Sequence, residues 1–152
     1  MLNLGFIYGH KRDKYNHPVI VIDCGLILKN EAKIDLLVGA TNFFIDYTIN
    51  KAMVPGQIEN WTAIFDMNAV GLTKMSSKHI QQIVKCMQRN FPARLYKFFG
   101  VGVTLLFRGV WALAHRFVDE FTKKKMSIYG SDYQKDLLAL IPAENLEKRF
   151  GG

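Results

Sequence analysis

Short apolar runs alternate along this chain with longer segments in which apolar residues recur every three or four positions. The first pattern is typical of β-strands and the second of amphipathic helices. The apolar runs predict strands at residues 4–8, 18–23, 61–67, 96–103 and 126–129. The periodic segments predict helices at residues 30–51, 77–89, 105–118 and 133–141, the first of them capped by Asn30.

Strands that alternate with helices require crossover connections, and such connections produce a largely parallel sheet covered by helices. The polar segment 10–17 lies between the first two predicted strands, so the chain is expected to open with a hairpin. No linker or internal repeat interrupts the pattern, and 152 residues suit one domain. We therefore expect a single α/β domain over residues 1–152, with a mixed, mostly parallel sheet.

The predicted helix 105–118 is the most apolar of the four. One broad stripe of this helix is apolar, while Arg108 and His115 fall on the opposite face together with Asp119. Leu105 and Leu113 lie off the stripe. Periodicity alone favours an ordinary helix packed on a sheet, although Gly109 in its interior costs about 1 kcal/mol relative to alanine and weakens it. The stripe consists of Phe107, Val110, Trp111, Ala114, Phe117 and Val118.

Composition narrows the class of protein. The longest apolar run, residues 100–107, is well short of the ~18 residues that span a bilayer, and the N-terminus does not resemble a secretion signal, so we expect a cytosolic protein. Cys24 and Cys86 are too far apart and too few for a disulfide framework. The net charge of +7 favours acidic partners, which include anionic membranes, phosphorylated small molecules and nucleic acids.

Several chemistries lack their residue patterns in this sequence. The four histidines are scattered without metal-ligand spacing, and no GxSxG nucleophile elbow occurs. Gly100 and Gly102 follow a strand, but the third glycine of a dinucleotide loop is replaced by Leu105. The aromatic residues at 96, 98 and 99 belong to a predicted central strand, where burial explains them better than nucleic-acid binding. We therefore expect no enzyme activity, no cofactor, no metal site and no nucleic-acid partner.

The order of motifs in the second half of the chain is more specific. Residues 91–97 (FPARLYK) precede the apolar helix, the lysines 123–125 follow it, and the chain ends in the segments 141–146 (IPAENL) and 150–152 (FGG). This arrangement resembles the CRAL-TRIO lipid-binding domain of the phosphatidylinositol/phosphatidylcholine transfer protein family, without the helical subdomain that normally precedes that domain. The resemblance covers nearly all of the chain and is strongest from Gly56 onward. It implies that helix 105–118 is a mobile gate over a hydrophobic lipid pocket.

The resemblance also implies which residues line that pocket. Phe98 on a strand matches family residues that line the lipid cavity, as do two residues of the gate helix. A second strand contributes alternate residues, which share one face of a sheet because side chains alternate along a strand. The implied pocket residues are Trp61, Ala63, Phe65, Phe98, Phe107, Val110 and Trp111.

At the rim, Lys125 matches the lysine with which the family meets the phosphate of phosphatidylinositol, and Asp119 matches an acidic residue at the end of the gate helix. A lysine ammonium suits a phosphate as a compact point charge. Three headgroup positions depart from the family pattern, as do residues 102–104 and Arg116 elsewhere in the chain. Ala93 replaces the glutamate that contacts inositol, and Trp61 and Ala63 replace the hydroxyl side chains that contact choline. From the residues alone, the lysines 123–125 can equally be a solvated basic surface.

These observations lead to one preferred function and two alternatives. We expect the chain to bind one amphipathic lipid, a phospholipid such as phosphatidylinositol or another hydrophobic ligand, and to transfer or present it between membranes. It would act as a cytoplasmic monomer with transient contact to anionic membranes. The alternatives are a lipid-sensing or membrane-targeting module of a larger signalling protein, and an enzyme that acts on a phosphorylated small molecule.

Overall fold

A five-stranded sheet forms the centre of this computed structural model, which describes residues 2–29, 33–70 and 77–152. The strands lie in the order in which they occur in the sequence. β1 pairs with β2 in the antiparallel direction and every later pair is parallel, so the prediction of a mixed, mostly parallel sheet is confirmed. The strands are β1 (Ile7–Arg12), β2 (Pro18–Asp23), β3 (Trp61–Asp66), β4 (Leu95–Val101) and β5 (Met126–Ile128).

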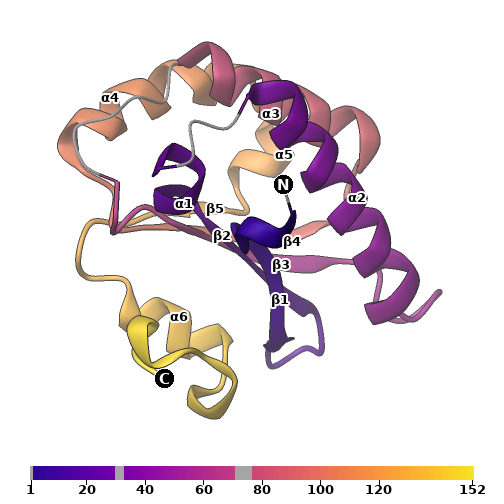
Figure 1. The fold of residues 1–152 in the computed structure, drawn as a ribbon. Coiled ribbons are helices and arrows are strands. Elements are labelled where there is room, and N and C mark those ends of the chain that lie inside the picture. The colour runs from indigo at the N-terminus through magenta and orange to yellow at the C-terminus, as the bar shows by residue number, and fades with distance from the viewer. Residues whose placement is uncertain (1, 30–32, 71–76) are drawn as a thin grey trace.

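The helices divide unequally between the two faces of the sheet (Figure 1). Because β2 to β5 follow one another in space, right-handed crossovers place every connecting helix on the same face. The C-terminal segment covers the opposite face. The helices of the first face are α1 (Cys24–Lys29), α2 (Ile34–Ala52), α3 (Ser77–Asn90), α4 (Leu105–Ala114) and α5 (Glu120–Lys123), with a 3-10 turn η2 (His115–Phe117) between the last two. The opposite face carries α6 (Gln134–Leu140), η3 (Ala143–Asn145) and η4 (Lys148–Phe150), while η1 (Leu2–Leu4) precedes β1.

Each face of the sheet has its own hydrophobic core. Alternate residues of β3 belong to different cores, as the two-residue period of a strand requires. Ala63 packs with the helix-rich layer, and Ile64 packs with α6 and the C-terminus. The core beneath the sheet is closely packed, because its central members have no exposed surface. These members are Ile64, Val101, Leu137, Ile141 and Phe150.

The structure differs from the sequence prediction mainly at element ends. β1 begins at Ile7 and continues to Arg12, into the segment predicted as a turn. Helix α1, which follows β2 directly, was not predicted. Helix α2 begins after Lys33, and Asn30, the predicted cap, lies outside the described residues. The predicted helix 105–118 ends at Ala114, and the chain then forms the turn η2 and the short helix α5.

Arg149 fastens the C-terminal segment to the carboxyl ends of β2 and β3. Its guanidinium lies 2.9 Å from Asp66, 3.3 Å from Asp23 and 2.6 Å from Glu147. Charged hydrogen bonds of this kind have defined directions, so they fix where the segment crosses the sheet. The C-terminal segment is thereby held against the face that lies away from the connecting helices.

Asp13 organises the turn between β1 and β2. Its buried carboxylate accepts hydrogen bonds from the backbone amides of Tyr15 and His17 at 2.9 and 3.0 Å. It also accepts one from the hydroxyl of Thr62 in β3 at 2.7 Å. One side chain therefore fixes both the hairpin turn and its position against the central strand.

We predict that Asp13→Ala lowers the free energy of unfolding by about 3 kcal/mol, because the two amides, the Thr62 hydroxyl and the His17 ring, whose Nδ1 lies 3.0 Å from Oδ2, all lose this partner. Urea denaturation followed by circular dichroism measures this change. Asp46→Ala, at an exposed position of α2, is the matched control and should stay within about 0.5 kcal/mol of wild type. A loss under about 1 kcal/mol for Asp13→Ala would show that the turn does not depend on this carboxylate.

Candidate functional site

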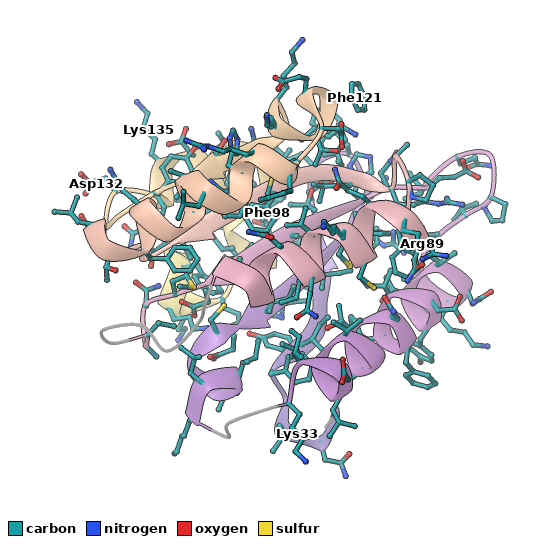
Figure 2. All side chains as sticks on the ribbon, turned by 90° about the horizontal axis from the view of Figure 1, so that it is seen from above. Lys33, Arg89, Phe98, Phe121, Asp132 and Lys135 are labelled. Carbon is teal, nitrogen blue, oxygen red and sulfur yellow. The ribbon has the colours of Figure 1, made fainter. Side chains whose placement is uncertain are left out.

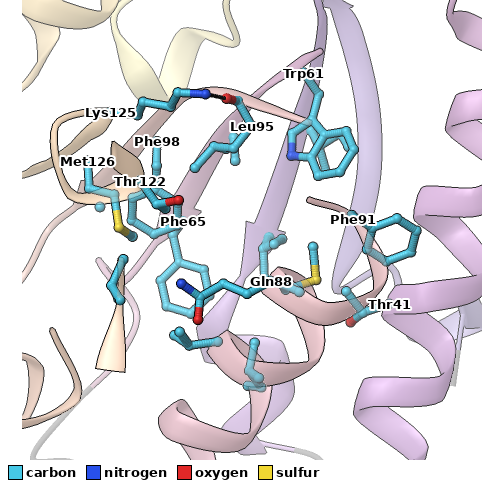
Figure 3. Close-up of a pocket in the computed structure, with 18 of the residues that line it drawn as sticks. Thr41, Trp61, Phe65, Gln88, Phe91, Leu95, Phe98, Thr122, Lys125 and Met126 are labelled. Atoms are coloured by element: carbon cyan, nitrogen blue, oxygen red, sulfur yellow. Dashed lines mark hydrogen bonds between the residues drawn. The ribbon is translucent and has the colours of Figure 1, made fainter. Parts of the chain in front are cut away.

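A cavity of about 220 Å³ lies between the sheet and the helices of its first face (Figure 3). Strands β2 to β5 form its floor, and α2, α3 and α4 contribute the walls and roof. The side chains that border it are predominantly apolar. All pocket and headgroup residues expected from the sequence border this one cavity, except Val110, whose side chain lies outside the described part of the chain. Their part in lipid binding stays a prediction.

The floor of the cavity has large and small residues in alternation across two strands. In the parallel pairing of β3 and β4, Ala63 lies opposite Phe98 and Phe65 lies opposite Gly100. Each large ring therefore has a small neighbour on the adjacent strand. All four residues border the cavity, together with Trp61 at the start of β3. The strand period places these side chains on one face, and the small members leave the space above them.

Aromatic rings connect the floor to the roof. The ring of Trp111 in α4 is nearly parallel to that of Phe98, with 6.2 Å between their centres. Phe65 lies 5.8 Å from Phe98 on the other side. Phe107, one turn before Trp111, is buried, and its backbone amide donates to the capping hydroxyl of Thr104 at 3.3 Å. The cap and the ring contacts together set the orientation of α4 over the sheet.

Most of the polar residues of the cavity gather at one end, where α3, α5 and the N-terminal ends of β4 and β5 meet (Figure 3). Asp119 caps α5 by accepting from the amide of Thr122 at 2.8 Å. Its other carboxylate oxygen accepts from Nε2 of Gln88 in α3 at 2.7 Å. Hydrogen bonding to Thr122, from its side chain and its amide, is the main reason that the pKa of Asp119 is lowered to about 2. This carboxylate is therefore charged at neutral pH.

Lys125 points across the same end of the cavity. Its ammonium donates to the backbone carbonyl of Leu95 at 2.6 Å and lies 4.3 Å from the centre of the Phe121 ring. Burial lowers the pKa of Lys125 from its ordinary value, while the charge of Asp119 acts in the opposite direction. A carbonyl and an aromatic face bind an ammonium without neutralising it. The cavity thus has a partly buried positive charge at its polar end.

Lysines 123, 124 and 125, which follow α4 and η2, have separate environments. Lys123 forms an ion pair with Glu120 at 2.6 Å, and Lys124 is exposed. Only Lys125 among these three borders the cavity. Lys125 therefore differs from its two neighbours, because it lies at the cavity and is partly buried there.

The outer surface of α4, η2 and α5 carries exposed apolar side chains. Leu105 is 84% exposed and Leu113 is also exposed, as expected for residues off the apolar stripe, and Phe121 is 64% exposed. Phe121 projects away from the body of the protein (Figure 2). Phe117 was expected on the buried stripe, and this expectation is wrong. Because α4 ends at Ala114, the 3-10 turn changes the direction of residues 115–117 and exposes the Phe117 ring.

Sequence reasoning missed several residues that border the cavity. Leu37, Thr41 and Ile45 recur every four residues on α2, a signal that was available in the sequence. Gln88 follows Val84 by four residues, so the two residues share one face of α3. Nothing in the sequence indicated that Gln88, a polar residue at the edge of an apolar stripe, contacts Asp119. The carbonyl of Leu95 belongs to the backbone, which sequence patterns do not identify as a ligand.

Two further findings concern the described residues as a group. They contain no cluster of three or more His, Cys, Asp or Glu side chains that is placed to hold a metal ion. None of their helices has both the length and the apolar character that crossing a membrane requires.

Comparison with known proteins identifies relatives over most of the chain. The SEC14 cytosolic factor of Yarrowia lipolytica is 31% identical over 157 residues, which cover 95% of this chain and 32% of that protein. The SEC14 cytosolic factor of Kluyveromyces lactis is 29% identical, with 95% of this chain and 52% of that protein covered. The phosphatidylinositol/phosphatidylcholine transfer protein SFH7 of Arabidopsis thaliana is 33% identical, with 72% and 21% covered. The chain thus spans between a fifth and about half of these relatives.

The fold is also found among solved structures. The crystal structure of Sfh5 superposes with a TM-score of 0.76, at 20% identity, and the match covers 90% of this chain and 50% of that one. At this identity the likeness concerns the fold alone. The model of the CRAL/TRIO domain family matches residues 2–152, which is nearly the whole sequence. The chain therefore belongs to the CRAL/TRIO domain family.

Proposed function

We propose that this chain encloses one amphipathic lipid, a phospholipid such as phosphatidylinositol, and transfers or presents it between membranes. The observation that carries the proposal is the distribution of polarity in the cavity. Its floor and roof are apolar, whereas Gln88, Asp119, Thr122 and Lys125 gather at one end. An amphipathic lipid has the same distribution, with apolar chains and one polar headgroup.

The energy of lipid exposure explains why an enclosed cavity is needed. Each methylene exposed to water costs ~0.8 kcal/mol, so two acyl chains with about 30 methylenes represent on the order of 24 kcal/mol. The cavity of about 220 Å³ is smaller than the roughly 300–1,000 Å³ usual for ligand pockets. A phospholipid therefore requires α4 and its neighbours to move outward. The weak packing of η2 and α5, neither of which has a buried residue, favours this movement.

In the proposed complex Lys125 binds the phosphate of the headgroup. Its ammonium would exchange the carbonyl of Leu95 for a phosphate oxygen, which is a stronger, charge-assisted acceptor. The partial burial of Lys125 strengthens this contact, because the surroundings screen charge less than water does. The names of two relatives support the choice of lipid, since the SFH7 and SFH4 proteins of Arabidopsis thaliana are phosphatidylinositol/phosphatidylcholine transfer proteins.

Exposed apolar and basic residues around the gate would hold the protein at membranes. Leu105, Leu113 and Phe121 can enter the interface, and the exposed side chains of Arg116 and Lys124 lie in the same segment. Each basic residue near an anionic surface adds about 1 kcal/mol of attraction. The protein would therefore work in the cytoplasm as a monomer, touch the membrane only during exchange and catalyse no reaction.

Lipid sensing without transfer is the second candidate function. The matched segment is only part of each relative. A longer protein could contain the same domain and use its pocket to detect lipid. Both functions need the cavity, and they differ in whether the chain by itself moves lipid between vesicles. An enzyme acting on a phosphorylated small molecule would in contrast turn over its substrate after all lipid has been removed.

We expect a lipid to copurify with the protein and to be identified by mass spectrometry of an organic extract. Ala63→Phe should abolish this lipid because the added ring fills the cavity floor opposite Phe98, while circular dichroism shows a retained fold. Ala139→Phe, at an exposed position of α6, is the control and should retain lipid. Wild-type protein that carries no lipid and takes up no fluorescent phospholipid would overturn the proposed function, and binding without vesicle-to-vesicle transfer would favour the sensing module.

Lys125→Ala should weaken the uptake of phosphatidylinositol about tenfold or more, because a charge-assisted contact of about 1.5–3 kcal/mol is lost. Uptake of a neutral diacylglycerol should fall much less. Titration with pyrene-labelled lipids measures both. Lys124→Ala removes the adjacent, exposed charge and is the matched control. Equal losses for the two lipids would leave Lys125 without a headgroup role.

Ala93→Glu should raise the preference for phosphatidylinositol over phosphatidylcholine. Ala93 borders the cavity and stands where the family's phosphatidylinositol carriers have a glutamate. Ala93 has a left-handed φ of 60°. Because alanine and glutamate are both L residues with a Cβ, the substitution adds no new backbone strain. The ratio of the two uptake rates measures the effect, and Ala93→Gln tests whether the charge is required. An unchanged ratio in both variants would place inositol recognition elsewhere.

A further inference from the structure

The polar end of the cavity is closed by a hydrogen bond between two elements that are distant in sequence. Nε2 of Gln88 in α3 lies 2.7 Å from Oδ2 of Asp119, the residue that begins α5. Both residues border the cavity. Nearby, the ammonium of Lys85 in α3 lies 5.4 Å from the centre of the Phe117 ring in η2. These two contacts join α3 to the segment that follows the gate helix.

This segment has little else to hold it. Within residues 115–123, all of which the structure describes, Val118 is the single buried residue. The remaining contacts of η2 and α5 are at the surface. A segment with so little buried apolar packing depends more on each of its hydrogen bonds than a segment in a core does. Loss of the Gln88–Asp119 bond would therefore free η2 and α5 before it disturbed the sheet.

Asp119 also belongs to the electrostatic environment of Lys125. Its negative charge favours the charged form of that lysine, and its own carboxylate is stabilised by Thr122 and Gln88. An anion that binds Lys125 would enter the field of Asp119. The anion and the carboxylate of Asp119 carry like charges and repel each other, and the repulsion is relieved if Asp119 moves away with α5.

We propose that Gln88 and Asp119 form a latch on the polar end of the cavity, and that a phosphate-bearing headgroup on Lys125 releases it. The release rests on the proposed lipid-binding function, whereas the latch itself does not. By thermodynamic linkage, a headgroup that weakens the latch is itself bound more weakly while the latch is closed. A protein without the latch should consequently favour phosphate-bearing lipids over neutral ones more strongly than wild type does.

The latch is tested in the lipid-free protein by hydrogen exchange of the amides of residues 115–123. Gln88→Glu places two carboxylates together and should raise these exchange rates about fivefold, the factor for a net hydrogen bond of about 1 kcal/mol. Adding Asp119→Asn should restore slow exchange, because the substituted asparagine still caps α5 and its amide can donate to the new glutamate. Gln82→Glu adds the same charge at an exposed position of α3 and should leave the rates unchanged.

A Gln88→Glu variant that exchanges like wild type, or a double variant that does not recover, would overturn the latch. The release is tested with Gln88→Ala by titration with pyrene-labelled phosphatidylinositol and pyrene-labelled diacylglycerol. The ratio of the two affinities should rise about fivefold in favour of the phosphate-bearing lipid. An unchanged ratio would overturn the release. Wild-type protein that binds neither probe would overturn the proposed function together with the release, and hydrogen exchange would still decide whether the latch exists.

Discussion

The two-residue period of β3 and β4 is the constraint on which the rest of this structure depends. Along each strand, successive side chains must serve two different layers. Ile64 and Val101 meet a closely packed layer below the sheet, whereas Ala63 and Phe98 border the cavity above it. The proposed opening of the roof would need this division, because the floor can stay in place only if its other face is closely packed. The Arg149 contacts and the C-terminal segment make the other face rigid.

The same constraint explains how far the sequence predicted the fold. The β-branched run of β2, the alternation in β3 and the helical spacing in α2 and α3 carry strong periodic signals, and these elements were predicted within a few residues. Helix α1 was missed because its six residues, CGLILK, are too few and too apolar to display a helical period. The break after Ala114 was missed because Phe117 and Val118 continue the helical spacing of the apolar stripe. The cap formed by Asp119 with Thr122 was the local signal for a new helix.

The polar end of the cavity was predictable only in part. A resemblance to a family pointed to Lys125 and Asp119, and the structure places both at the cavity. The sequence could not single out Lys125 among the three adjacent lysines, because its partner lies farther away along the chain than local patterns reach. Glu120 pairs with Lys123, and the carbonyl of Leu95 receives Lys125 from a strand 30 residues away. The contact of Gln88 could not be predicted for the same reason, since its partner Asp119 belongs to another element.

The proposed movement of the roof requires segments that are not anchored in a core. Within residues 115–123, Phe117 and Phe121 are exposed and Val118 alone is buried. The segment then depends on polar contacts, which depend on charge and can be exchanged for a ligand's own contacts. Apolar packing responds to the size of a ligand, whereas a carboxylate beside a lysine responds to the charge of the ligand. In the proposed complex, polar closure at this end would allow the protein to distinguish headgroups by whether they help to open it.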